Sequence, residues 1–240
     1  MSPDIRKHRG AHPADRKLFS PDKLPLLRGA VSDLSWLLTR GYTMKAALKL
    51  VGDRHSLTDR QRLAVSRAAC SDQSRLGRAE TRVSHKAIAG EELIVDAFNL
   101  IITVEAALSG GVLIQCRDGC IRDLSSVHGS YRSVNETDQA MRLIGSALEE
   151  FSPKSVDWLL DRPISNSGRL AKRIRDLTSE NDWNWTVKVL FNPDAEIIAS
   201  KTVVISSDSH VLDQVGRWMN FNNYLLNERL SNFWLIDLSG

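Results

Sequence analysis

The pattern of apolar and polar positions divides the chain near residue 90. Beyond that point, short apolar runs alternate with amphipathic stretches. The runs cover residues 93–95, 112–114, 156–160, 185–191, 203–205 and 233–238. Between two of them, residues 140–151 repeat apolar side chains at the i, i+3, i+4, i+7 spacing of one helix face. This alternation predicts an α/β domain over residues 91–240, in which helices cover both faces of a parallel sheet.

The first 90 residues show a different pattern, dominated by helical spacing and charge. Residues 1–29 contain four prolines, many charges and few apolar side chains, which favours a flexible basic lead-in. Three helical patterns follow within residues 30–76, and the third begins with Thr58 and Gln61 at the spacing of a capping box. Residues 77–90 lose this periodicity. We therefore predict a small, basic, all-helical module over residues 30–76 and a linker over residues 77–90.

The composition of the 240-residue chain is close to the average of soluble globular proteins, with 42% hydrophobic and 25% charged residues. It excludes a wholly disordered, collagen-like or disulfide-framework protein. The sequence has no apolar run of about 20 residues, and its N-terminus is too polar for a signal peptide, so we expect a cytoplasmic protein without membrane contact. The spacing of Cys70, Cys116 and Cys120 fits neither a CxxC pair nor a zinc quartet, which indicates buried thiols.

The net charge of +3 conceals an uneven distribution of charged residues. Residues 1–90 carry 18 lysines and arginines against 8 acidic residues, whereas residues 91–240 carry 14 against 21. A basic segment joined to an acidic one indicates that the first binds a polyanion. The third helical pattern places Arg60, Arg62 and Arg67 opposite its apolar face, as in a helix-turn-helix module. We expect these arginines to bind RNA, with DNA as a second candidate, and an ordinary solvated helix face is the alternative.

Three of the expected strands end on an aspartate. Asp96, Asp161 and Asp208 each follow an apolar run, and Asp118 follows a fourth. Because the carboxyl ends of parallel strands share one edge of the sheet, we expect these side chains to converge where α/β proteins bind ligands. Crowded carboxylates need a cation, and oxygen ligands without a matching His or Cys set suit Mg²⁺ or Mn²⁺. Such a site favours phosphodiester hydrolysis, and simple helix capping by each aspartate is the alternative.

Several motifs carry a resemblance to known families. The strand-ending Asp96 followed by Asn99, the helical Glu136-Thr137-Asp138, the strand-ending Asp161 and the turn at residues 206–209 resemble the PIN-like nuclease superfamily, particularly its NYN branch. The whole chain, including residues 41–62 and 161–169, is also similar to an uncharacterised prokaryotic family, the domain of unknown function 434. The PIN resemblance covers residues 91–240 and implies a Rossmann-like sheet, a divalent metal and ribonuclease activity.

The PIN resemblance also implies a role for each acidic residue. It makes Asp96 the first acidic ligand, Asp138 or Glu136 the acid on the central helix, Asp161 the third ligand and Asp208 the fourth. The sequence departs from the PIN pattern at the second acid, for which Asp118 and Asp123 also compete. A degenerate PIN-like domain that binds RNA or nucleotides without cleaving them is therefore an alternative.

Polar side chains around these aspartates are candidates for substrate binding. We expect Asn99 to orient the metal or the substrate. The segment after Asp161 opens a helix with small polar residues and a glycine, which suits a phosphate at a helix N-terminus. Its candidate phosphate ligands are Arg162, Ser165, Asn166, Ser167 and Arg169. Ser207 and Ser209 are candidates for the same reason, and a plain helix-capping loop is the alternative in both places.

Two histidines and a tyrosine complete the set of candidates. His128 and His210 could each act as a general acid or bind a phosphate, although a metal-bound water needs no histidine base. Tyr131 and Arg132 could stack on and neutralise single-stranded nucleic acid.

The sequence thus predicts a metal-dependent nuclease, most directly a ribonuclease, in which Asp96, Asp138, Asp161 and Asp208 hold Mg²⁺ or Mn²⁺. The first alternative is the inactive PIN-like binding module. The second is a small-molecule phosphohydrolase with Asp96 as nucleophile, against which stands Phe98 at the position of the usual second aspartate. The expected partner is RNA, and assembly as a homodimer is an option that the sequence leaves open.

Overall fold

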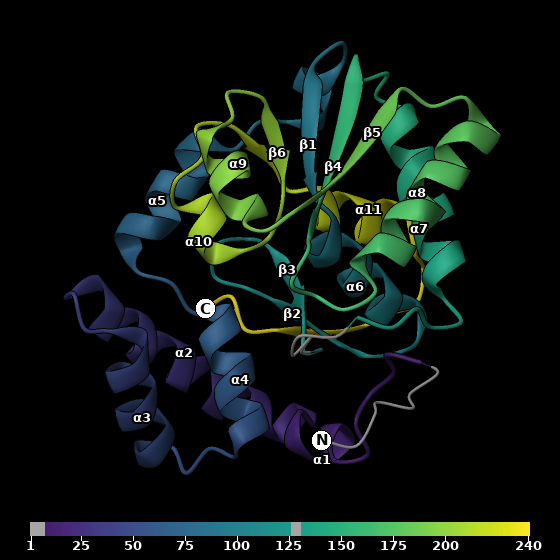
Figure 1. The fold of residues 1–240 in the computed structure, drawn as a ribbon. Helices are drawn as coiled ribbons and strands as arrows, with labels where there is room; N and C mark the ends of the chain where they lie inside the picture. The colour runs from purple at the N-terminus through teal and green to yellow at the C-terminus, as the bar shows by residue number, and fades with distance from the viewer. Residues whose placement is uncertain (1–7, 126–130) are drawn as a thin grey trace.

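The computed structural model describes residues 8–125 and 131–240 (Figure 1). Its larger sheet has five strands in the order β5-β4-β1-β6-β7, and every neighbouring pair is parallel. The strands are β1 (Glu92–Asp96), β4 (Ser155–Asp161), β5 (Trp185–Leu190), β6 (Val203–Ile205) and β7 (Trp218–Met219). The predicted α/β class, with a helix-flanked parallel sheet and an N-terminal helical segment, is confirmed.

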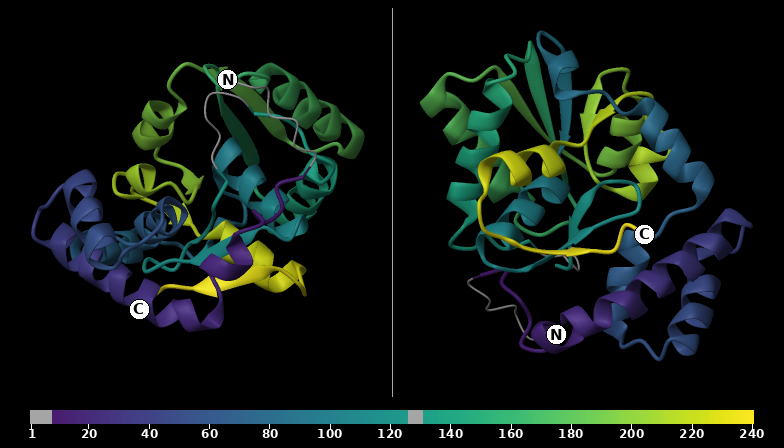
Figure 2. Two further views of the ribbon diagram at one scale, coloured as in Figure 1. Left: turned by 90° about the horizontal axis from the view of Figure 1, so that it is seen from below. Right: turned by 180° about the vertical axis from the view of Figure 1, so that it is seen from behind.

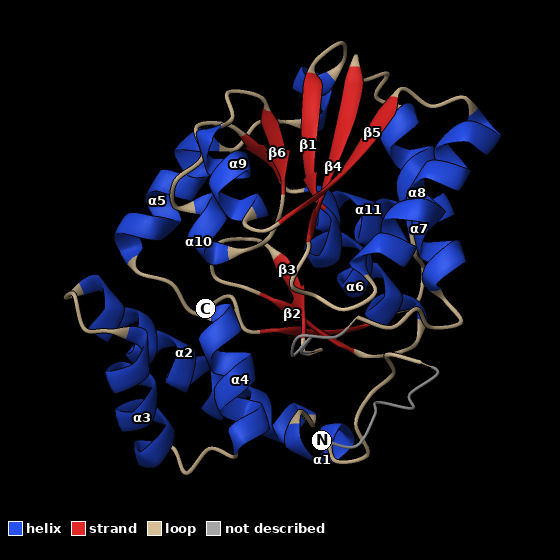
Figure 3. Cartoon of the chain, viewed as in Figure 1, coloured by secondary structure: helices blue, strands red, loops and turns tan. Residues whose placement is uncertain are grey.

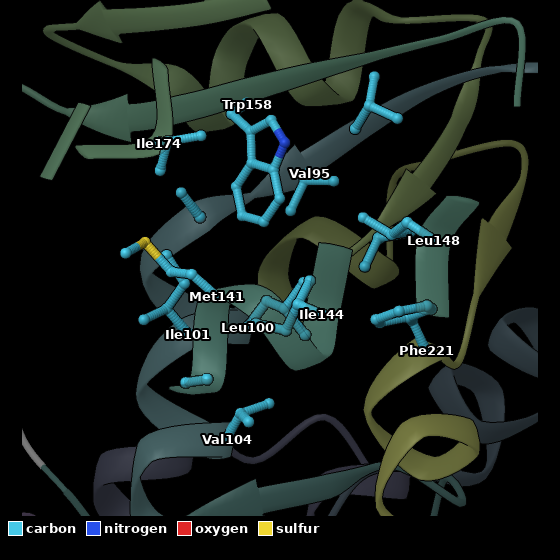
Figure 4. Packing of buried hydrophobic residues seen from close by; sticks show 14 of the residues in the cluster. Val95, Leu100, Ile101, Val104, Met141, Ile144, Leu148, Trp158, Ile174 and Phe221 are labelled. Carbon is cyan, nitrogen blue, oxygen red and sulfur yellow. The ribbon is translucent and has the colours of Figure 1, made fainter. Parts of the chain in front are cut away.

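Helices cover both faces of this sheet because its strands alternate their apolar side chains between two core clusters. Val95 and Trp158 face one cluster, whereas Ile94 and Leu159 face the other. The first cluster is closed by α6 (Ala97–Leu108), α7 (Thr137–Glu149), α8 (Ser167–Asn181) and α11 (Phe221–Arg229). The second is closed by α9 (Pro193–Ala199) and α10 (Ser209–Leu212). Figure 4 shows Trp158 over Val95 in the first cluster, with Leu100 and Ile144 beneath them.

A second, three-stranded sheet lies beyond α6 (Figure 3). It consists of β2 (Val112–Gln115), β3 (Ile121–Asp123) and β8 (Trp234–Asp237), with β2 antiparallel to β3 and parallel to β8. The apolar runs at residues 112–114 and 233–238 therefore do form strands, but not in the sheet to which we assigned them. Helix α6 contacts both sheets and is buried along nearly its whole length, which explains why most of its side chains are apolar.

The segment before residue 90 is helical. It contains α1 (Asp15–Leu18), η1 (Pro21–Lys23), α2 (Leu24–Thr39), α3 (Met44–Arg54), α4 (Asp59–Ala68), α5 (Asp72–Thr81) and η2 (His85–Ile88). The capping box of Thr58 and Gln61 is present at the start of α4. The structure differs from the expected flexible lead-in, because α1 and the first turn of α2 lie before residue 30. It differs from the expected linker as well, since α5 continues to Thr81 and η2 follows.

The helical segment shares a hydrophobic core with the second sheet. Leu34 of α2 and Val65 of α4 belong to one cluster of buried side chains with Val112 and Ile114 of β2 and Ile236 of β8. The segment consequently packs against the α/β body at the side of β2, as the view from behind shows (Figure 2). The three cysteines are buried free thiols, as predicted. None of the helices in the described ranges has the length and apolar character needed to cross a bilayer.

Candidate active site

A cavity of about 460 Å³ opens at the carboxyl edge of the larger sheet. Asp96 at the end of β1, Asp161 at the end of β4 and Asp208, three residues after β6, all line it. The structure thus brings together the three strand-end aspartates that the sequence predicted to converge. Asp194 in the first turn of α9 adds a fourth carboxylate to the same cavity.

Asp96 is held in place by two hydrogen bonds. Its carboxylate accepts one from the Ser206 hydroxyl at 2.8 Å and one from the Asn99 backbone N–H at 3.4 Å, which caps α6. The pKa of Asp96 is raised to about 7, chiefly by burial and also by the nearby Asp208 carboxylate, while the Ser206 hydrogen bond opposes the shift. A cation in the cavity would remove this cost by favouring the charged carboxylate.

Asp208 caps α10 and is joined to Asp96 through one serine. Its carboxylate accepts from the backbone N–H groups of His210 at 2.8 Å and Val211 at 3.1 Å. The Asp208 backbone N–H donates to the Ser206 hydroxyl at 3.0 Å, and that hydroxyl in turn donates to Asp96. Helix capping, the alternative considered for these aspartates, therefore applies to Asp96 and Asp208, and it leaves both of them at the cavity.

The position of Asn99 links α6 to the loop that carries Asp208. Its side-chain oxygen accepts hydrogen bonds from the backbone N–H and from the hydroxyl of Ser207, the N–H bond measuring 3.2 Å. Asn222 of α11 donates to the same hydroxyl at 3.4 Å. Asn99, Ser207 and Ser209 all line the cavity, so these candidates for substrate binding lie beside the carboxylates.

Asp161 and Asp194 are the other two members of this group of cavity-lining aspartates. Burial raises the pKa of Asp161, and the Asp194 carboxylate adds to the shift. Burial likewise raises the pKa of Asp194, with a further contribution from Asp208. Asp194 was not among the site residues predicted from the sequence. The signal was the sequence Asn192-Pro193-Asp194, a helix start immediately after a predicted strand, which places a carboxylate at the same sheet edge.

The cavity also has a basic side, formed by Arg67 of α4 and Arg122 of β3. Arg122 is buried, and its guanidinium donates to the Asp118 carboxylate at 2.6 and 3.0 Å. It also donates to the Ser207 backbone oxygen at 2.7 Å. Asp118 was a candidate for the second acidic ligand, but this ion pair holds it away from the cavity lining. Asp123, another candidate, lines the cavity and accepts from Thr103 at 2.9 Å.

The acid expected on the central helix lies elsewhere. Asp138, in the first turn of α7, forms an ion pair with Arg173 of α8, and its side chain is 48% exposed. The buried stripe of α7, including Met141 and Ile144, faces the core, and Asp138 lies off this stripe. Glu136 pairs with His8 at 2.6 Å. Neither acid lines the cavity.

The polar residues that follow Asp161 make contacts within the protein. Asn166 adopts the left-handed conformation and donates to the Tyr131 backbone oxygen at 2.7 Å, while Ser167 is buried. Arg162 stacks on Phe191, with 4.5 Å between its guanidinium carbon and the ring centre. The proposed phosphate ligands of this segment do not line the cavity: Arg162, Ser165, Asn166, Ser167 and Arg169. Ile164 is the residue of this stretch that does.

The expected basic face of α4 is occupied by internal ion pairs. Arg60 donates to the buried Asp15 of α1 at 2.7 Å, and Arg62 donates to Asp53 of α3 at 2.8 Å. A pattern of charges along one helix does not show which acidic partners fold against it. The two side chains stay 27% and 23% exposed, and RNA binding by them stays a prediction. Arg67 differs from them because it reaches the cavity.

The remaining candidates have other surroundings. Tyr131 is buried and donates its hydroxyl to Glu105 at 2.6 Å, so it offers no exposed ring for stacking. His210 is exposed and lines a neighbouring cavity with Asp194 and Gln214. His128 lies outside the described residues.

The donor set fits a magnesium or manganese ion held by few protein ligands. Across residues 8–125 and 131–240, no three acidic, histidine or cysteine side chains converge closely enough to enclose a metal together. Mg²⁺ commonly uses one or two carboxylates and completes its shell with water and substrate phosphate. Asp96 and Asp208 are the candidate pair, because both line the cavity and the charge of the Asp208 carboxylate acts on Asp96.

Two family models match consecutive parts of the chain. A family model described as a domain of unknown function, DUF5616, matches residues 85–224, and one described as a protein of unknown function, DUF434, matches residues 26–80. The resemblance to domain of unknown function 434 is thus confirmed for the helical segment. An uncharacterised protein of Methanocaldococcus jannaschii is 31% identical over 183 residues, which cover 76% of this chain and 87% of the relative. No solved structure matches the chain significantly.

Proposed function

The chain belongs to the DUF5616 family, and we propose that it is a metal-dependent nuclease that hydrolyses the phosphodiester bonds of RNA. The observation that carries this proposal is the convergence of Asp96, Asp161, Asp194 and Asp208 on one cavity at the carboxyl edge of a parallel sheet. The PIN-like resemblance of Asp96, Asn99, Asp161 and the turn at residues 206–209 supports it. The proposed acidic set has Asp194 in the place for which the sequence offered Asp138.

In the proposed site, Asp96 and Asp208 would hold Mg²⁺ or Mn²⁺. The bound ion would supply an activated water and stabilise the leaving oxygen. The Ser206 hydroxyl donates to the Asp96 carboxylate and accepts from the Asp208 backbone N–H. It thereby fixes the position of one aspartate relative to the other. Asp161 and Asp194, whose pKa values are raised, would orient the attacking water and accept its proton. Asn99 would keep the Ser207 loop, and with it Asp208, at a fixed distance from α6.

The choice of RNA follows from the excess of positive charge in residues 1–90 and from the PIN-like resemblance. A cytoplasmic location is part of the same proposal and agrees with three unpaired cysteines. DNA as a second substrate and a homodimer as the assembly are outcomes that the experiments below would reveal.

The first test is incubation of purified protein with labelled single-stranded and structured RNA in Mg²⁺, in Mn²⁺ and in EDTA. The variants are Asp96→Asn and Asp208→Asn, and Asp176→Asn of α8 is the control because its carboxylate is exposed and pairs with Lys172. We expect cleavage that needs the metal, is lost in the two site variants and is kept in the control. Cleavage that persists in EDTA and in Asp96→Asn would contradict the proposal. Salt-sensitive RNA binding without cleavage would identify an inactive binding module.

The size of the cavity favours one alternative function. A volume of about 460 Å³ lies within the range of small-ligand pockets, as expected of a phosphohydrolase that acts on a small phosphate monoester. In that case Asp96 would attack phosphorus as a nucleophile. The rates of hydrolysis of a p-nitrophenyl phosphate diester and of a p-nitrophenyl phosphate monoester distinguish the two functions. A nuclease should hydrolyse the diester faster, and a phosphohydrolase the monoester.

A further inference from the structure

We propose that Arg67 of α4 binds a substrate phosphate inside the candidate active site. The helical segment matched by the DUF434 model would then recognise the substrate within the cavity, instead of forming a separate nucleic-acid surface. This inference rests on the proposed function, because it places a phosphate next to the same carboxylates.

The position of Arg67 is fixed from two sides. Its helix packs on β2 and belongs to the core that the helical segment shares with the second sheet. Its guanidinium extends to the end of β3, where Nη1 donates to the Asp123 backbone oxygen and Nη2 donates to the Ser125 backbone oxygen at 2.7 Å. The side chain is therefore held at the cavity wall before any ligand arrives.

The guanidinium of Arg67 keeps donors for a ligand. An arginine has five N–H groups, and two of the three nitrogens are engaged with β3 and the residues after it. Within the part of the chain that the structure describes, no group accepts a hydrogen bond from Nε. The side chain is 27% exposed. Arg67 can consequently donate to an anion without breaking the contacts that position it.

The charge balance of the cavity favours such a group in addition to the proposed metal ion. Five aspartates line it, namely Asp96, Asp123, Asp161, Asp194 and Asp208. A phosphate cannot approach this wall unless cations offset the repulsion. Arg122 contributes less, because it is buried and its donors point to Asp118, Ser207 and the Arg67 backbone oxygen. Arg67 also lies near a carboxylate, with 3.4 Å between its Nη1 and the Asp123 Oδ1, but its side chain is 27% exposed whereas that of Arg122 is 9% exposed. Among the described residues, it is thus the cavity-lining cation with the greater solvent access, and the fork of an arginine matches phosphate oxygens.

The test measures binding of adenosine 5′-monophosphate in Mg²⁺ by calorimetry. Arg67→Gln should weaken binding about 10- to 100-fold, and Arg67→Lys should fall between this variant and the wild type because it keeps the charge and loses the fork. Arg75→Gln is the matched control, since Arg75 is an exposed arginine on the neighbouring α5, and it should bind as the wild type does. Unchanged binding in Arg67→Gln, or no binding by the wild type, would overturn the inference.

A second measurement guards against a variant that folds poorly. In wild-type protein, the Nε–H resonance of Arg67, assigned by its absence in Arg67→Lys, should shift in the NMR spectrum when the nucleotide is added. A resonance that does not move while nucleotide binds would overturn the inference. The RNA cleavage assay separates the two proposals. Nucleotide binding through Arg67 without RNA cleavage would refute the nuclease proposal and support the phosphate site. RNA cleavage with an unchanged KM in Arg67→Gln would support the nuclease proposal and refute the phosphate site.

Discussion

The guanidinium of Arg78 on α5 donates a 2.6 Å hydrogen bond to the carboxylate of Asp118 in the turn between β2 and β3, and both side chains are almost fully buried. Arg122 donates to the same carboxylate, and Arg78 also donates to Asp213, at the end of α10, at 2.8 Å. Because Arg122 further binds the backbone oxygen of Ser207, this network joins the helical segment to the loop that carries a candidate metal ligand.

Replacing Asp118 with asparagine should destabilise the fold by about 3 kcal/mol, since it leaves the buried Arg122 without its carboxylate partner and Arg78 with Asp213 alone. Burial alone would raise the pKa of Asp118, but Arg122 and Arg78 hold it well below its usual range. This contribution to stability is present above about pH 4 and is lost as the pH falls through the lowered pKa. Urea unfolding at pH 7 measures the loss, with Asp176→Asn as a surface control that changes stability by less than about 1 kcal/mol. A loss as small as the control's would contradict this role.

Replacing Asp96 with asparagine should stabilise the metal-free protein at pH 8 by about 1 to 3 kcal/mol. The pKa of Asp96 is raised to about 7, so its ionisation destabilises the folded chain as the pH rises from about 4 through that value. The difference from the wild type should therefore shrink towards pH 4. Urea unfolding in EDTA at several pH values measures it. Added Mg²⁺ should stabilise the wild type and leave the variant unchanged, and a variant less stable than the wild type at pH 8 would refute the prediction.

Asp194→Asn should lower RNA cleavage at least about tenfold, whereas Asp138→Asn should stay within about twofold of the wild type. Asp194 lines the acidic cavity, while Asp138 is half exposed and paired with Arg173. Initial rates in Mn²⁺ provide the comparison, and thermal unfolding checks that both variants are folded. A greater loss of cleavage in Asp138→Asn than in Asp194→Asn would instead favour Asp138 as the second acidic ligand.

Gly145→Ala should destabilise the protein by about 1 to 3 kcal/mol, because a Cβ atom there would lie 2.2 Å from the ring of Trp183. That ring is stacked on Trp185 at 4.3 Å, so it has little freedom to move aside. Gly77→Ala in α5 meets no atom within 4 Å and should stabilise the protein by about 0.5 to 1 kcal/mol. Thermal unfolding of both variants tests the pair, and a tolerated Gly145→Ala would show that α7 can shift from Trp183.

The sequence predicted the features that depend on local pattern and on the geometry of parallel strands. Asp96, Asp161 and Asp208 could be placed together because each ends or follows a strand whose carboxyl end lies at the same edge. The second sheet could not be foreseen, since β2 pairs with a strand more than a hundred residues away and its apolar run looks like those of the larger sheet. The pairing of Arg60 with Asp15 is likewise set by tertiary packing, which cannot be predicted from the pattern of charges along the sequence.

The core shared by the helical segment and the second sheet bears on whether the two parts of the chain could be encoded by separate genes. The two family matches meet between residues 80 and 85, yet Leu34 and Val65 on one side of that point pack with Ile114 and Ile236 on the other. A gene split at this boundary would yield two fragments with complementary apolar faces, each aggregation-prone by itself. The two parts would then function by reassociating, and selection would act on them as one unit.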